Sequence, residues 1–174
     1  MDTFVALLVY LQAFGAIVGA GSAVLAELAY ARAMRDGHVD KAERAHLDIL
    51  ARGLRWGMTF LLLSSFGLVV SAYQAGVPLQ PALTTSYWSF IALALLATSV
   101  SYALSRGRIS FSLGSAVVFT AWWFLAYLAL GQLPTLSFGA VVAFYVVATG
   151  FFYGLLRLLR HLMTLAAWRT TNIV

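Results

Sequence analysis

Two long runs without a charged residue constrain this chain more than any other feature of its sequence. The first covers residues 56–105 and the second covers residues 109–156. A transmembrane helix needs about 20 apolar residues, so each run can supply two membrane spans. The chain is 62% hydrophobic and 10% charged, whereas a soluble domain has about 25% charged residues. The sequence therefore predicts an integral membrane protein.

Glycine and proline divide these runs into separate spans. The first run is interrupted by Gly76, Pro78 and Pro81, and the second by residues 131–134. The predicted spans are 3–30, 57–74, 86–104, 111–130 and 138–156. The first segment is too long for the apolar part of a signal peptide, and Asp2 stands where a basic residue would be expected. We therefore predict an all-α bundle of five transmembrane helices that forms one domain over residues 1–174.

The connection between the first two spans predicts a further helix. Asp36 and Gly37 form a turn signal, and Asp40 and Glu43 have the spacing of a capping box. Over residues 42–56, leucine and charged side chains fall on opposite faces. We predict an amphipathic cytoplasmic helix that lies at the membrane surface and runs into the second span.

The basic residues predict how the chain crosses the membrane. All of them lie in the first connection, in the third connection or after the fifth span: Arg32, Arg35, Lys41, Arg44, Arg52, Arg55, Arg106, Arg108, Arg157, Arg160 and Arg169. Because basic residues favour the cytoplasmic side, the N-terminus is predicted outside and the C-terminus inside. The net charge of +5 is then explained by basic residues that set the orientation of the chain in the membrane, and we predict no nucleic-acid partner. The predicted location is the inner (plasma) membrane of a bacterial cell.

Small residues follow one face of the first span. Gly15, Gly19 and Ala23 are spaced four apart, and this spacing allows close helix packing in lipid. Gly150 and Gly154 repeat the pattern in the fifth span. We predict that the two small-residue faces pack against each other or form contacts in an oligomer.

Glu27 continues the small-residue face of the first span and is the only acid within an apolar segment. It lies about 15 Å from the middle of the span, at the edge of a bilayer core of roughly 30 Å. Two readings stay open. In one, the carboxylate reaches the interface or pairs with Arg157, the predicted partner; in the other, Glu27 and Arg157 belong to a site that binds a proton or small ion.

Other candidate sites gain less support from the sequence. There is no cysteine, and His38, His46 and His161 all lie outside the spans, so we predict neither a metal site nor a bound cofactor. No set of catalytic residues is present, and an enzymatic function therefore gains no support. Serine and threonine hydroxyls within the spans are expected to link helices. Aromatic residues of the last two spans could line a pocket for a lipid or quinone: Phe119, Trp122, Trp123, Phe124, Tyr127, Phe144, Tyr145, Phe151, Phe152 and Tyr153.

The first 75 residues contain a recognisable combination of features. A glycine-rich first helix carries Glu27 shortly before the turn Arg35-Asp36-Gly37. This combination resembles a poorly characterised group of bacterial multi-span membrane proteins, and the resemblance implies the topology and directs attention to Glu27. The layout is also similar to that of copper-resistance D-type membrane proteins, whose histidines this chain lacks.

Three functions are compatible with this pattern. The first is a small membrane protein that binds or conducts a solute or ion, as a homo-oligomer because five spans are few for a single-chain carrier. The second is a non-catalytic accessory or assembly subunit of a larger membrane complex. The third is a binder of an apolar molecule such as a quinone or lipid. In each case the lipid bilayer is a partner.

Overall fold

The structure is a computed structural model that describes residues 3–33, 40–78, 81–132 and 136–171. The turn at 35–37 and His38 lie outside the described residues. The described elements are α1 (Thr3–Ala33), α2 (Lys41–Gln74), the short 3-10 helix η1 (Pro81–Leu83), α3 (Thr85–Ser105), α4 (Phe111–Ala129) and α5 (Phe138–Thr171). The five α-helices are all long and apolar enough to cross a membrane, as predicted.

Three of the predicted breaks between helices contain a glycine in the left-handed backbone region. Gly76, Gly107 and Gly131 have φ values of +62°, +63° and +65°. The residue after each glycine donates its N–H to a carbonyl five positions earlier; Gln132, for example, donates to the Tyr127 oxygen at 2.9 Å. This is the Schellman ending of a helix, which glycine forms without steric cost. The helices α2, α3 and α4 end here at Gln74, Ser105 and Ala129, beside the predicted span ends at residues 74, 104 and 130.

Helix α2 begins at the predicted cap and continues without interruption through the second apolar segment. The Asp40 N–H donates to Glu43 Oε2 at 2.9 Å, as the capping-box spacing predicts. The amphipathic segment is therefore the first part of one 34-residue helix rather than a separate element. Helix α5 likewise continues past residue 156, through Arg157 and Arg160.

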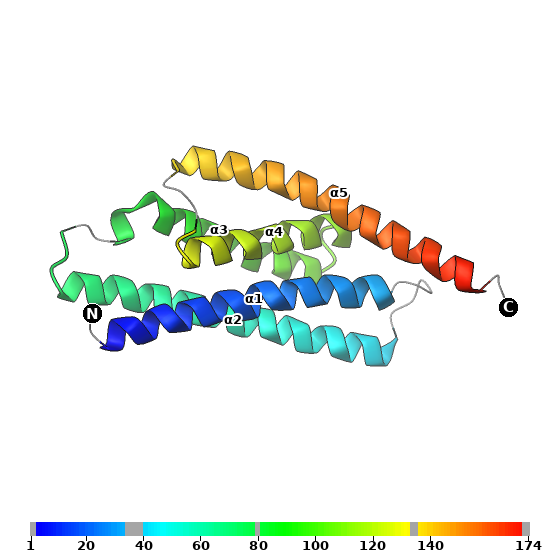
Figure 1. The fold of residues 1–174 in the computed structure, drawn as a ribbon, viewed down its shortest axis with the longest axis horizontal. Coiled ribbons are helices and arrows are strands. Elements are labelled where there is room, and N and C mark those ends of the chain that lie inside the picture. Colours follow the sequence, from blue (N-terminus) through cyan, green and yellow to red (C-terminus); the bar gives the residue numbers. More distant parts are fainter. Residues whose placement is uncertain (1–2, 34–39, 79–80, 133–135, 172–174) are drawn as a thin grey trace.

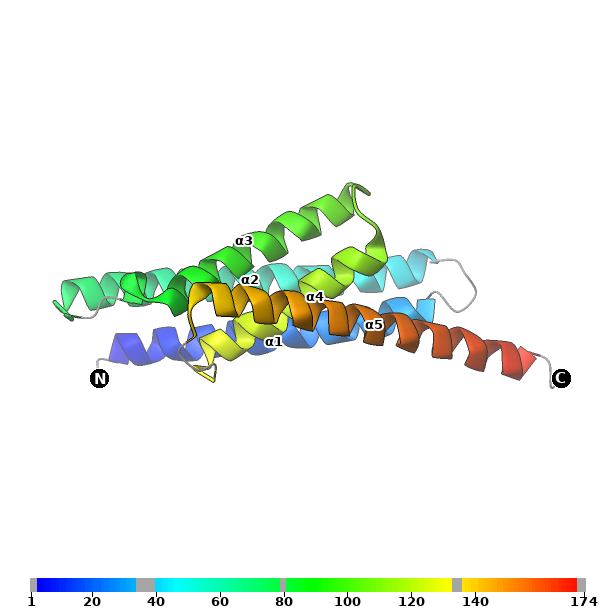
Figure 2. The same cartoon turned by 90° about the horizontal axis from the view of Figure 1, so that it is seen from above.

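The helices run roughly along one long axis, with α1 and α2 side by side and antiparallel (Figure 1). Helix α4 lies between this pair and α5 (Figure 1), while α3 leans outward toward its C-terminal end (Figure 2). Sixty-one per cent of the α4 span is buried, against 17–28% of the other spans. Helix α4 is thus the central element of the bundle.

Two of the buried hydroxyl groups bond within their own helix and do not link helices in the way the sequence predicts. Ser64 Oγ donates to the Phe60 carbonyl at 2.6 Å, and Thr120 Oγ1 donates to the Ala116 carbonyl at 2.8 Å. Both acceptors lie one turn earlier on the same helix, which satisfies the hydroxyl locally. Ser115 is different, because its hydroxyl also accepts a hydrogen bond from another helix.

Candidate functional site

The small-residue face of α1 packs against α2 and α4. A Cβ atom added to Gly57 of α2 would lie 2.9 Å from the Gly15 carbonyl oxygen and 2.9 Å from the Gly19 Cα. A Cβ on Gly19 would also overlap the ring of Trp122 on α4. Ala23 on the same face is 4% exposed. The glycines of α1 therefore permit close approach of two neighbouring helices.

The second small-residue face does not contact the first. Gly150 and Gly154 are exposed on α5, and a Cβ added to either would meet nothing within 4 Å. The expectation that they pack against Gly15 and Gly19 is wrong, because Gly57 and Trp122 fill that role. A contact between copies of the chain through Gly150 and Gly154 stays a prediction.

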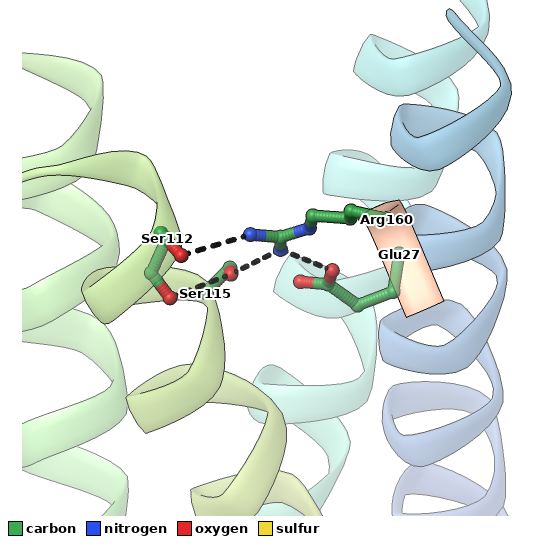
Figure 3. A network of polar contacts seen from close by, with 4 residues as sticks. All are labelled: Glu27, Ser112, Ser115 and Arg160. Atoms are coloured by element: carbon green, nitrogen blue, oxygen red, sulfur yellow. Dashed lines mark hydrogen bonds and ion pairs between the residues drawn. The ribbon is translucent and has the colours of Figure 1, made fainter. Parts of the chain in front are cut away.

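Glu27 lies at the end of the packed face and forms an ion pair with α5. Its Oε2 atom accepts a hydrogen bond from Arg160 Nη2 at 2.6 Å. The two side chains are only 9% and 17% exposed. The carboxylate is thus neutralised by a partner on the last helix of the bundle (Figure 3).

The guanidinium group of Arg160 also binds two serines near the N-terminal end of α4. Nη2 donates to Ser115 Oγ at 2.7 Å and Nη1 donates to Ser112 Oγ at 3.2 Å. The Cζ atom lies 5.3 Å from the ring centroids of both Tyr30 and Phe111, which stack on each other at 3.8 Å. A cation near aromatic rings gains further electrostatic stabilisation. One arginine therefore ties α1, α4 and α5 together.

The sequence predicts the wrong arginine as the partner of Glu27. Arg157 is exposed, while Arg160, three residues later on the same helix, points into the bundle. The sequence places both arginines at the correct end of α5 but does not reveal the rotation of the helix about its axis. Ser112 and Ser115 lie three residues apart and therefore on one face of α4. This spacing is the feature of the sequence from which their shared contact with one side chain could be predicted.

A second candidate site is an aromatic groove between α4 and α5, with a volume of about 540 Å³. Six of its eight lining residues belong to the predicted aromatic set: Phe119, Trp123, Phe124, Tyr127, Phe144 and Phe152. The others are Ala148 and Gln132. The remaining predicted aromatics do not line the groove; Trp122, for example, is packed in the core. The groove is uncharged and runs beside α4 for roughly 15 Å, from Phe119 to the end of the helix.

The groove walls are held by ring contacts between the two helices. Phe119 meets Phe152 edge to face at 5.2 Å, and Phe124 meets Phe144 at 5.2 Å. A hydrogen bond also joins the two helices, because the Tyr145 hydroxyl of α5 donates to the Val117 carbonyl of α4 at 2.8 Å. These contacts keep α4 and α5 at a defined separation along the groove.

Metal-ligating side chains do not cluster within the described residues. No group of three or more His, Asp or Glu side chains in these ranges could hold a metal ion. Comparison with protein-family models, curated proteins and solved structures finds no match to this chain. Only the two sites themselves therefore indicate a function for this chain.

Proposed function

We propose that this chain is a multi-pass membrane protein that binds an apolar, membrane-soluble molecule in the groove between α4 and α5. The observation that carries the proposal is the groove itself. Its volume of about 540 Å³ falls within the roughly 300–1,000 Å³ of small-molecule sites, and its walls are mainly aromatic. An uncharged groove of this kind favours apolar rings and chains over ions or polar solutes.

The polar groups around the groove narrow the class of ligand. Gln132 lies at the end of the groove next to the α4–α5 connection, where its Nε2 donates to the Leu130 carbonyl at 3.4 Å. Its Oε1 atom and second amide hydrogen can bind a polar group. Trp123 also lines the groove, and its buried indole N–H has no hydrogen-bond partner among the described residues. We therefore expect an amphiphile with an apolar body and hydrogen-bonding oxygens, as in a quinone or a lipid.

Conduction of an ion or solute has less support. The sequence predicts that function from Glu27, whose side chain is 9% exposed and is paired with Arg160. A cation would have to displace the guanidinium group to reach it. The closed pair favours a structural role for Glu27. The accessory-subunit hypothesis stays a prediction, and it is compatible with ligand binding in the groove.

The test is to identify what the protein binds. The chain is purified in mild detergent, extracted with organic solvent and analysed by mass spectrometry, beside the variant Ala148→Phe. The larger side chain would fill the groove, so the enriched amphiphile should be lost. Ala143→Phe is the matched control, because Ala143 is exposed on the same helix and does not line the groove. The proposal would be refuted if both variants retained equal amounts of the amphiphile, or if no amphiphile were enriched with the wild-type protein.

Identification of the extracted molecule distinguishes the two ligand types. A quinone has a redox-sensitive ultraviolet spectrum, whereas a phospholipid does not absorb there. If the compound is a quinone, its addition to ligand-free protein should quench tryptophan fluorescence, because Trp123 lines the groove.

A further inference from the structure

A smaller cavity of about 290 Å³ lies on α2 and is lined by Arg52, Arg55, Trp56 and Thr59. The last three residues follow Arg52 by three, four and seven positions, so all four share one face of the helix. They lie where the charged first part of α2 meets its charge-free second part. If α2 spans a membrane, this is the level of the lipid headgroups.

The two arginines of this cavity are free to bind an anion. Neither forms an ion pair with a carboxylate in the parts of the chain that the structure describes, including Asp48 one turn earlier. Arg55 Nε donates to the Ala51 carbonyl at 3.3 Å, which leaves its terminal nitrogens available. Thr59 Oγ1 donates to the Arg55 carbonyl at 3.0 Å, so the guanidinium groups are the main donors. The N–H groups of a guanidinium match the geometry of two phosphate oxygens, and the guanidinium forms strong charge-assisted hydrogen bonds with a phosphate.

The same face of α2 continues as an apolar surface. Trp56 is 60% exposed and stacks on Phe60 at 5.8 Å. Leu63 and Phe66, at the next positions along this face, are 60% and 65% exposed. Arginines, an interfacial indole and apolar side chains therefore follow one another along the helix. This order matches the headgroup, the ester region and the acyl chain of a phospholipid.

We infer that the face formed by Arg52, Arg55, Trp56 and Thr59 binds the phosphate of an anionic phospholipid in the cytoplasmic leaflet. Two cations that have no carboxylate partner among the described residues favour an anionic lipid over a zwitterionic one. The continuous apolar surface beyond Trp56 favours a lipid over free phosphate, because it accommodates an acyl chain. The inference shares the membrane setting of the proposed function but does not depend on the α4–α5 groove.

The experiment measures binding of phosphatidylglycerol and phosphatidylcholine with the same acyl chains by native mass spectrometry of the full chain. The wild type should retain phosphatidylglycerol preferentially. The double variant Arg52→Gln/Arg55→Gln should weaken that binding by about tenfold or more, because it removes both phosphate donors. The matched control Arg106→Gln/Arg108→Gln removes the same charge from the α3–α4 connection and should change binding by less than about threefold.

Three results would overturn the inference. Equal retention of the two lipids by the wild type would exclude a preference for anionic headgroups, and this measurement needs no variant to fold. An equal loss of phosphatidylglycerol binding in the Arg106→Gln/Arg108→Gln control would show that binding depends on overall charge and not on this face. Displacement of the lipid by millimolar inorganic phosphate would assign the cavity to free phosphate. The groove variant Ala148→Phe should bind phosphatidylglycerol like the wild type, which separates this test from that of the proposed function.

Discussion

Gly57 of α2 lies so close to Gly15 of α1 that a Cβ atom on either residue would be 2.9 Å from the carbonyl oxygen of the other. Both neighbours are backbone atoms, which cannot move aside as a flexible side chain can. The contact therefore depends on the absence of a side chain on both helices. It sets the distance between α1 and α2.

Substitution of Gly57 by alanine should destabilise the bundle. The added methyl group forces the two helices apart, and overpacking of this kind costs about 1–3 kcal/mol. Unfolding by denaturing detergent, followed by tryptophan fluorescence, measures the change. Gly21→Ala is the control, because a Cβ there meets nothing within 4 Å and alanine favours a helix. If the two variants lost equal stability, the tight contact would not limit packing.

Neutralisation of Glu27 should also destabilise the protein. In Glu27→Gln the Arg160 charge stays buried without its counterion, and loss of one partner of a buried pair costs about 3 kcal/mol. The same unfolding assay applies. Arg157→Gln should change stability by less than about 0.5 kcal/mol, because Arg157 is exposed.

A double-mutant cycle separates the ion pair from other effects of these substitutions. Glu27→Gln/Arg160→Gln should lose clearly less stability than the sum of the two single variants, because neither charge is left alone. Strict additivity would mean that the carboxylate and the guanidinium do not interact.

Removal of the Tyr145 hydroxyl should loosen α5 from α4. Tyr145→Phe deletes the 2.8 Å hydrogen bond to the Val117 carbonyl, and an interhelical bond in a membrane contributes about 0.6 kcal/mol. The same unfolding assay should detect this small loss. Tyr153→Phe on the same helix serves as the control. A larger loss in the control would contradict the role of Tyr145.

The predicted topology can be tested directly because the chain contains no cysteine. A single cysteine in Gln132→Cys should react with a membrane-impermeant maleimide in intact cells. A cysteine in Arg108→Cys should react only after the membrane is permeabilised, since basic connections lie on the cytoplasmic side. The opposite pattern of labelling would invert the topology.

The sequence predicts the helices of this fold well because their limits have local causes. Gly76, Gly107 and Gly131 end helices through their own backbone conformation, and the apolar runs set the helix lengths. The rotation of each helix has no local cause. Arg157 and Arg160 have the same charge and nearly the same depth, so only the packing of α5 reveals which one meets Glu27.

The same limit explains the wrong pairing of the glycine faces. Gly150 and Gly154 have the spacing of a packing face, yet they are exposed. Gly53 and Gly57 have the same spacing in α2 and do lie against α1, where Gly57 meets Gly15 and Gly53 meets Ser22. The spacing identifies faces suited to close packing but not their partners. The sequence shows that aromatic residues are concentrated in the last two spans. Which of these residues line the groove depends on the angle between α4 and α5.

The pairing of Glu27 with Arg160 also has a consequence for synthesis of the protein. The two residues are 133 positions apart, so the ribosome makes the carboxylate long before the guanidinium group. At about 5–20 residues per second, that interval is roughly 7–27 s. Throughout it, α1 carries a negative charge that has no partner from α5. The last helix therefore completes the neutralisation of the first, and a nascent chain that stops before α5 retains an uncompensated acid.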